Sequence, residues 1–348
     1  MENKNYSEPA NSGGALPMIL SHAAYYADPQ SILNQYPLSK NWNVVWAGNF
    51  SNANYAFIAT DGSAYAVAIR GSELDFSEAA LVNWFEEDLN VYLHNTWDWY
   101  VPTSAGNNYK AIISRGAYDG LTELQTMTDA TTGGTLADFL VTNAANNNAW
   151  ITVTGHSLGG NLATVFGPWL QWYINNNSSS NYNGKNTVYS NMGVYTYAAP
   201  TAGNPDFAEY YDDLFPGTNS ARFYNTNDII PQFAANISTV ENMFTNGPQA
   251  AQISYTYDGI TVTLSNFFFG VRMSLYADMW KYGFYTQTNQ TAGTFSFTLP
   301  IDQTYLANTL EDWLEQAASQ HSGVAYLNHF LDAQKVFAKR SKPVQVSL

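Results

Sequence analysis

The sequence predicts an α/β fold in which a mostly parallel central sheet is flanked by helices. Short β-branched and aromatic runs alternate with stretches of helical periodicity along most of the 348 residues, which is the pattern of a three-layer α/β protein. In addition, the β-branched run 151–154 meets Gly155-His156-Ser157-Leu158-Gly159, and a helix-compatible stretch follows. A sharp strand-to-helix turn of this kind is typical of a parallel sheet.

The first part of the chain supplies one helix and three strands. Residues 1–16 are polar, and we expect a loose arm there. Apolar residues follow helical spacing over 16–26, and the pattern stops before Asp28-Pro29. Strands are expected at 43–48, 55–60 and 64–69, with Asp61-Gly62 as the hairpin turn between the last two.

The alternation continues through the middle of the chain. An amphipathic stretch is expected at 81–92, and further helices at 117–127, 136–145, 161 to about 173, and 205–213. Further strands are expected at 151–154, 193–197 and 221–227.

Residues 235–300 break this rhythm. A hairpin is expected over 253–264 around Asp258-Gly259, and a strongly aromatic segment, 267–285, follows it. No linker rich in Pro, Gly or Ser flanks this part, so we interpret 235–300 as an insertion within one domain that spans 1–348. Two helices at 305–318 and 324–338 close the fold.

Composition excludes several classes of protein. The net charge is −15 with only 13 Lys and Arg residues, which argues against nucleic acid or an anionic membrane as a partner. No run of 18 apolar residues occurs, so no transmembrane segment is expected. The absence of cysteine excludes disulfides, thiolate metal sites and a cysteine nucleophile.

The Gly-x-Ser-x-Gly turn makes Ser157 a candidate nucleophile. Gly155 and Gly159 carry no Cβ, so the strand and the helix can approach closely around a strained residue. The pentapeptide alone is weak, because roughly one in ten chains of this length would contain it by chance. An ordinary strand-to-helix turn is an equal alternative until partners for Ser157 are found.

Such a serine needs a base within hydrogen-bond reach and an acid that orients the base. Among the five histidines, His321 is the best candidate, because it lies in Gln320-His321-Ser322-Gly323, a break between two predicted helices. His329 lies within a helix among apolar residues, which favours a structural role. The remaining histidines are placed in the first helix, after the amphipathic stretch and inside the turn itself: His22, His94 and His156.

Asp228 is the best candidate for the acid. It follows the strand 221–227, which Pro231 prevents from extending, and working residues of open α/β sheets lie at the carboxyl ends of strands. Asp228 would hold the tautomer of His321 and stabilise its imidazolium form. Asp302 is a weaker alternative. The other aspartates of this region have structural explanations, on a helix face or in a turn: Asp206, Asp212, Asp213 and Asp258.

Negative charge that develops on a substrate would need two backbone N–H groups. Leu158 supplies one by its position after the serine. The other is expected after the strand 64–69, where Gly71 turns the chain and Ser72 offers an N–H and a hydroxyl. Arg70 is interpreted as a member of a structural ion pair. The amphipathic stretch after Ser72 is either plain core or a lid over a pocket.

These motifs, in this order, resemble the class 3 lipase family. The resemblance rests on Ile69-Arg70-Gly71-Ser72 and on the segments 83–89, 154–160, 195–204, 225–231 and 321–327, and it spans roughly 18–340. It implies an α/β-hydrolase fold, a triad of Ser157, Asp228 and His321, and Ser72 and Leu158 as oxyanion donors. It also implies a lid at 73–92. The insertion 235–300 has no counterpart that we can assign in the family.

The resemblance implies a serine carboxylic-ester hydrolase, and in particular a triacylglycerol lipase that needs no cofactor or metal. Its partner would be an acylglycerol or another lipid ester at an oil–water interface. Trp84, Phe85, Phe267 and Phe268 are predicted to contact the substrate, the last two in an acyl-binding trough. One alternative is an esterase of the phospholipase A1 or feruloyl type, and a remote one is a non-catalytic binding protein. A secreted location is expected, with a cytoplasmic one as the alternative, although no signal peptide is visible.

Overall fold

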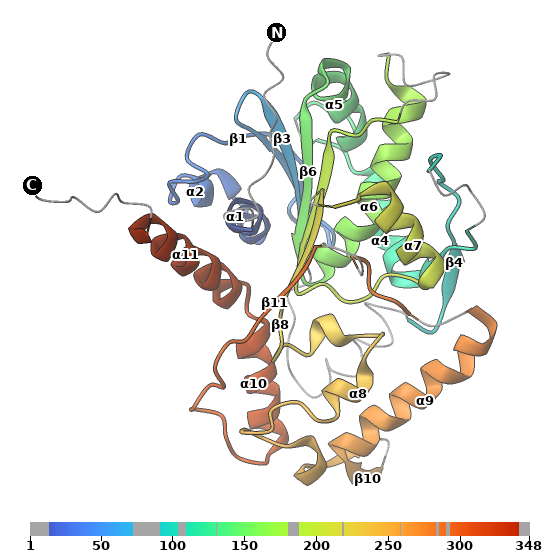
Figure 1. The fold of residues 1–348 in the computed structure, drawn as a ribbon, viewed down its shortest axis with the longest axis vertical. Helices are drawn as coiled ribbons and strands as arrows, with labels where there is room; N and C mark the ends of the chain where they lie inside the picture. Colours follow the sequence, from blue (N-terminus) through green and yellow to red (C-terminus); the bar gives the residue numbers. More distant parts are fainter. Residues whose placement is uncertain are drawn as a thin grey trace, which may run out of the picture.

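A seven-stranded sheet forms the middle of the molecule (Figure 1), in the order β1-β2-β3-β6-β7-β8-β11. The computed structural model describes residues 14–71, 91–103, 109–129, 131–179, 188–217, 219–257, 259–282, 285–289 and 293–340. The strands of this sheet are β1 Asn43–Ala47, β2 Ala56–Thr60, β3 Ala64–Ile69, β6 Trp150–His156, β7 Met192–Tyr197, β8 Ser220–Asn225 and β11 Thr294–Phe297.

The sheet is mostly parallel. Strands β3, β6, β7, β8 and β11 pair in parallel, whereas β1 and β2 add two antiparallel pairings at one edge. The hairpin between β2 and β3 turns at Asp61, whose Oδ1 accepts the N–H groups of Ser63 and Ala64, and at Gly62, whose φ is 91°. Every residue of β7 is buried, as expected for a strand covered on both faces. The predicted fold class is confirmed.

Helices cover both faces of the sheet. One face packs against α4, α5, α6 and α7, and the other against α1, α2 and α11. Within the described ranges, the helices are α1 Ala15–Ala23, α2 Pro29–Leu33, α4 Arg115–Thr126, α5 Leu136–Asn143, α6 Leu158–Asn177, α7 Pro205–Leu214, α8 Ile237–Val240, α9 Leu264–Tyr282, α10 Leu310–His321 and α11 Gly323–Arg340. In this part of the chain, no helix is both long enough and apolar enough to cross a bilayer.

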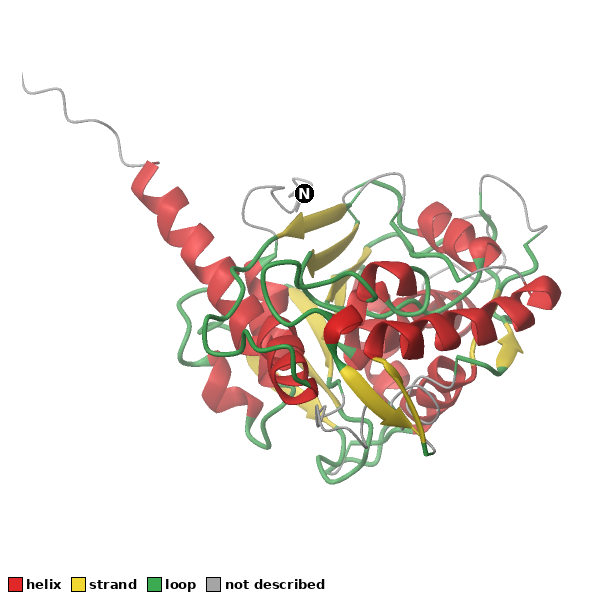
Figure 2. Cartoon of the chain, turned by 90° about the horizontal axis from the view of Figure 1, so that it is seen from below, coloured by secondary structure: helices red, strands yellow, loops and turns green. Residues whose placement is uncertain are grey.

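A third hydrophobic cluster lies at the carboxyl ends of the parallel strands. It is built by buried residues between Ile229 and Ala317 together with Val91. In Figure 1, α8, α9 and α10 lie beyond the ends of β6 and β8. Figure 2 looks onto this end of the molecule, with α9 and the hairpin of β9 (Ser254–Tyr257) and β10 (Ile260–Thr263) in front of the sheet. We call this part, residues 229–282 with α10, the cap.

Several elements differ from expectation. A small sheet of β4 (His94–Thr96) and β5 (Ile112–Ser114) was not predicted. Strand β11, within the range interpreted as an insertion, joins the main sheet beside β8. Helix α10 begins later than the predicted residue 305, because Thr309 caps its start by accepting the N–H of Asp312 at 3.1 Å. Most of the amphipathic stretch 81–92 lies outside the described residues.

Candidate active site

Ser157 occupies the turn between β6 and α6. Its φ of 60° and ψ of −132° form a backbone conformation that residues with a side chain rarely adopt. Its N–H donates to the carbonyl of Tyr197 on β7 at 2.9 Å. A Cβ at Gly155 would lie 2.8 Å from the backbone nitrogen of Gly160, and a Cβ at Gly159 would lie 2.7 Å from the carbonyl carbon of Arg70. The two glycines therefore permit the strained turn, as predicted from the pentapeptide.

Three side chains from distant parts of the chain meet at this turn. Nε2 of His321 lies 2.8 Å from Oγ of Ser157, and Nδ1 of His321 lies 2.9 Å from Oδ2 of Asp228. All three residues are buried. In this arrangement the carboxylate can orient an imidazole that takes a proton from the hydroxyl. The structure thus brings together the three residues that the sequence predicted as a triad, and their catalytic role stays a prediction.

The carboxylate of Asp228 has two further donors. The N–H of Ile230 donates to Oδ1 at 3.0 Å, and the hydroxyl of Tyr326 donates to Oδ2 at 2.8 Å. The same hydroxyl accepts the N–H of Asn225 at 2.8 Å. Burial, and then the charge of Asp228, raise the pKa of Tyr326 well above its usual value, so the phenol remains a proton donor.

Sequence reasoning missed Tyr326. The residue belongs to the segment 321–327 that carries the family resemblance, on the helix that follows His321. The tyrosine within this segment was the one signal in the sequence. Its partner, Asp228, lies 98 residues away, and local sequence does not reveal that contact.

His321 is the last residue of α10, at the edge of the predicted break between two helices. Only Ser322 separates α10 from α11. Gln320 explains why the helix continues: its amide accepts from Asn225 at 2.7 Å and donates to the carbonyl of Pro300 at 2.8 Å. These long-range bonds hold the last turn of α10, and local sequence patterns do not reveal them.

His156 packs against the candidate base. Its ring centroid lies 4.8 Å from that of His321, and its Nδ1 lies 3.1 Å from the hydroxyl of Tyr25. Burial, followed by the neighbouring His321, lowers the pKa of His156 well below the usual 6.5. His156 is therefore neutral near pH 7 and places no second positive charge beside His321.

The other histidines have structural contacts. His22 is buried in α1, with its Nε2 at 3.3 Å from the hydroxyl of Tyr26. His329 stacks on Phe297 at 3.9 Å between ring centroids, in agreement with the structural role favoured for it. His94 lies in β4, with its ring 5.8 Å from that of Tyr285.

The alternative aspartates lie elsewhere. Asp302 accepts the N–H of Thr304 at 2.9 Å, and hydrogen bonds from that residue lower the pKa of Asp302. Three aspartates of α7 accept hydrogen bonds from other parts of the chain. Asp206 accepts the N–H of Lys110, Asp212 accepts the N–H of Asn289, and Asp213 accepts the hydroxyl of Tyr109. Asp258 lies outside the described residues.

The candidate oxyanion donors are described in part. Leu158 is the first residue of α6, and its N–H is one of those that a helix leaves without an intrahelical acceptor. Ser72 lies outside the described residues, as do Trp84, Phe85 and nearly all of the predicted lid at 73–92. Gly71 is described: a Cβ there would lie 2.6 Å from the carbonyl oxygen of His156 and 3.1 Å from Cβ of Ser157. The chain that leaves β3 towards Ser72 therefore passes directly beside Ser157.

Arg70 has a structural role, and its acceptors among the described residues are carbonyl oxygens, not the carboxylate of the predicted ion pair. Its guanidinium donates to the carbonyls of Phe50 and Ala53, each at 3.1 Å, and to that of Asn52. It also lies 4.6 Å from the ring centroid of Phe50. Carbonyl oxygens of the loop after β1 thus take the place of the expected carboxylate.

The two predicted substrate contacts in α9 lie in different environments. Phe268 is fully buried in the cap, with its ring 5.4 Å from Trp313 and 6.4 Å from Phe233. Phe267 is partly buried and lies 5.5 Å from Phe268. Phe268 therefore packs as a core side chain. A contact with substrate stays a prediction for both residues.

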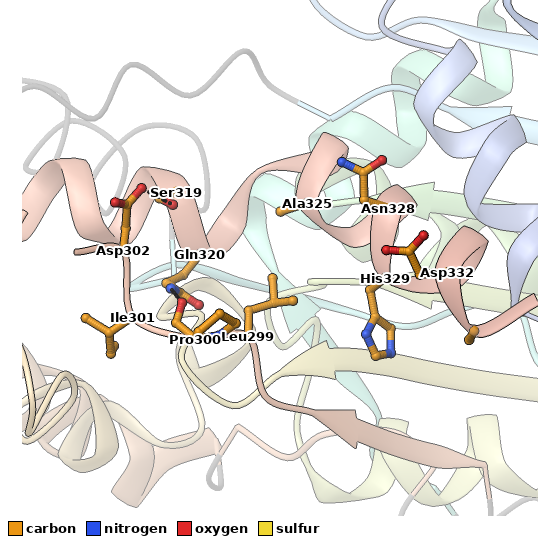
Figure 3. Close-up of a pocket in the computed structure, with 11 residues that line it drawn as sticks. Leu299, Pro300, Ile301, Asp302, Ser319, Gln320, Ala325, Asn328, His329 and Asp332 are labelled. Carbon is orange, nitrogen blue, oxygen red and sulfur yellow. Dashed lines mark hydrogen bonds between the residues drawn. The ribbon is translucent and has the colours of Figure 1, made fainter. Parts of the chain in front are cut away.

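An open hollow of about 660 Å³ lies between the loop 299–302 and the junction of α10 and α11 (Figure 3). Asp302, His329 and Asp332 are among its polar lining residues, whereas Ser157, Asp228 and His321 do not line it. The hollow is therefore distinct from the triad. Among the residues that the structure describes, no three His, Asp or Glu side chains gather in a way that could hold a metal ion.

Comparisons with known proteins agree with this architecture. Residues 66–237 match the model of a family described as lipase (class 3). The chain is similar to the crystal structure of M37 lipase with a TM-score of 0.67 and 22% identity, over 91% of this chain and 93% of that one. It also matches the Lip2 lipase of Yarrowia lipolytica with a TM-score of 0.41 and 18% identity, over 62% of this chain and 73% of that one. The first of these likenesses shows a shared fold.

Proposed function

The chain belongs to the class 3 lipase family, within the α/β-hydrolase fold, and from this premise we propose that it is a triacylglycerol lipase that acts through an acyl-enzyme. The observation that carries the proposal is the buried chain of hydrogen bonds from Ser157 through His321 to Asp228, with lengths of 2.8 and 2.9 Å. The strained backbone of Ser157 and the helix that begins directly after it support the same reaction.

In the proposed reaction, Nε2 of His321 takes the proton of Ser157 as Oγ attacks the ester carbonyl. Asp228 holds the Nδ1–H of His321 and stabilises the imidazolium that forms. The N–H groups of Leu158 and Ser72 would receive the negative charge of the tetrahedral intermediate. His321 then gives its proton to the leaving alcohol as the ester C–O bond breaks. Water, deprotonated by His321, hydrolyses the acyl-enzyme and restores Ser157.

Covalent labelling tests the first step. A fluorophosphonate should label the wild-type protein once, and Ser157→Ala should remove the label. Asn161→Ser is the control for a substitution in the same helix, and it should keep the label. Asn161 lies on the next turn of α6, where its amide donates to the carbonyl of Pro200 at 3.1 Å. Absence of labelling in the folded wild-type protein would contradict the serine-hydrolase mechanism and favour the binding-protein alternative.

The substrate class needs a second experiment. Hydrolysis of tributyrin is measured at concentrations below and above its solubility limit. A rate that jumps when droplets appear is expected for a lipase. A rate that saturates in solution, with faster turnover of phospholipid or feruloyl esters, would favour the esterase alternative on the same machinery.

A further inference from the structure

Helix α9 is apolar on two opposite faces. Leu264, Phe268, Val271 and Leu275 form the inner face and are buried in the cap. On the opposite face, Phe269, Met273 and Tyr276 are exposed by 48%, 49% and 39%. At 3.6 residues per turn these three positions lie within about one sixth of the helix circumference. We call them the outer stripe. A globular protein normally presents polar residues on the face opposite its core.

The outer stripe carries no charge. The other exposed positions between Leu264 and Tyr276 are also uncharged, namely Asn266, Gly270 and Ser274. The one ionised side chain in this stretch is Arg272. It pairs with Glu241 beside α8 at 3.1 Å and lies 5.1 Å from the ring centroid of Phe269. The charge of Arg272 is therefore balanced within the cap, and the stripe presents a neutral surface.

The cap that carries the outer stripe packs against elements of the candidate active site. The cap cluster on the inner side of α9 includes Trp313 and Ala317 of α10, the helix that ends at His321, and Leu158 packs against the same cluster. Val91, near the C-terminal end of the predicted lid, belongs to this cluster as well, and its carbonyl accepts the hydroxyl of Tyr285 at 2.8 Å. Figure 2 shows α9 on the outside of this end of the molecule.

We propose that the outer stripe of α9 docks the protein on the surface of a neutral lipid phase, such as an acylglycerol droplet. Three exposed apolar side chains on one helix face gain free energy by leaving water for an apolar medium. The net charge of −15 disfavours anionic lipid surfaces. Docking through the outer stripe would hold the cap, which packs against elements of the candidate active site, on the substrate phase. The proposal rests on the proposed lipase function and assigns its docking surface.

The test compares three variants with the wild type. The stripe variant carries Phe269→Gln and Met273→Gln, and Met273→Gln alone serves as a milder version. The matched control carries Leu38→Gln and Val45→Gln, two apolar residues of similar exposure, 42% and 40%, near β1 at the far edge of the sheet. Thermal unfolding checks the fold of each protein, and all are expected to match the wild type because the changed side chains are exposed.

Adsorption is measured by flotation with a triolein emulsion coated with phosphatidylcholine. Binding of the stripe variant should fall about tenfold or more, whereas the control should bind like the wild type. Hydrolysis of dissolved p-nitrophenyl acetate should be equal in all the proteins. Adsorption that depends on the stripe, in a protein that hydrolyses no ester, would support the docking surface and contradict the lipase activity.

Three results would overturn the proposal. The first is unchanged adsorption of the stripe variant. The second is stronger binding of the wild type to vesicles containing phosphatidylglycerol than to neutral lipid. The third is a wild-type dimer in sedimentation velocity that the stripe variant turns into a monomer without loss of adsorption, because the stripe would then bind a second copy of the chain.

Discussion

Tyr326 donates a hydrogen bond of 2.8 Å to the carboxylate of Asp228, from a position 98 residues further along the chain. Through this bond the first turns of α11 are tied to the acid of the candidate triad. Since the hydroxyl also accepts the N–H of Asn225, the tyrosine links the end of β8 to the carboxylate that follows it. Both residues are buried, so the loss of either partner would leave a polar group without compensation.

Replacement of Tyr326 by Phe removes this donor and keeps the ring. A buried hydrogen bond to a charged group contributes about 1.5–3 kcal/mol, so the free energy of unfolding should fall by that amount. If the transition state of the reaction also loses about 1.4 kcal/mol of stabilisation, kcat falls about tenfold with little change in KM. Tyr211→Phe is the matched control, because its buried hydroxyl bonds Ser220 at 2.6 Å, away from the triad. Equal effects of both variants on kcat would contradict a positioning role for Tyr326.

Replacement of Gly159 by Ala should damage both stability and activity. The new Cβ would lie 2.7 Å from the carbonyl carbon of Arg70 and 2.8 Å from the nitrogen of Gly71, and backbone atoms cannot move aside cheaply. Overpacking of this kind costs about 3 kcal/mol. Gly270→Ala in α9 is the control: no atom lies within 4 Å of its Cβ, and about 0.5–1 kcal/mol of stabilisation is expected. Urea unfolding measures both, and a Gly159→Ala variant as stable as the wild type would contradict the close approach of α6 to β3.

Stability should fall as the pH drops below 6.5. Burial lowers the pKa of His156 and of His22 in the folded protein. In the unfolded chain both titrate near 6.5, so below that pH the unfolded state binds more protons than the folded state, and protonation favours unfolding. The loss continues down to the lowered pKa values of the folded state. Urea unfolding at pH 8, 6.5 and 5.5 measures the trend, and His22→Gln should make it shallower. A free energy of unfolding that rises as the pH falls from 8 to 5.5 would contradict this prediction.

Truncation of the two phenylalanines separates core packing from substrate contact. Phe268→Ala should lower the free energy of unfolding by about 3–5 kcal/mol, because the ring is fully buried against Trp313. Phe267→Ala should cost less, because that side chain is only partly buried. If the predicted acyl-binding trough exists, Phe267→Ala changes the preference among glycerides of different chain length. An unchanged chain-length profile would rule out the trough at Phe267.

Much of the fold and of the candidate site followed from local sequence. Alternating strand and helix patterns predicted the α/β class, because periodicity is set by neighbours within one or two turns. Gly155 and Gly159 predicted the turn at Ser157, and Pro231 placed Asp228 after the end of a strand, where such residues work. His321 was selected by its place in a break between two predicted helices, although α10 ends three residues later than predicted, at His321 itself.

The sequence by itself determined most of the helices and strands of the main sheet layers and the residues that are chemically suited to the triad. Tertiary structure decided the rest: the parallel pairing of β11 with β8, the bond from Tyr326 to Asp228, and the outward apolar face of α9. Each of these depends on contacts between segments far apart in the chain, and local propensity carries no information about such contacts. Phe268 and Phe269 are adjacent and chemically identical, yet packing buries the first in the cap and leaves the second facing solvent.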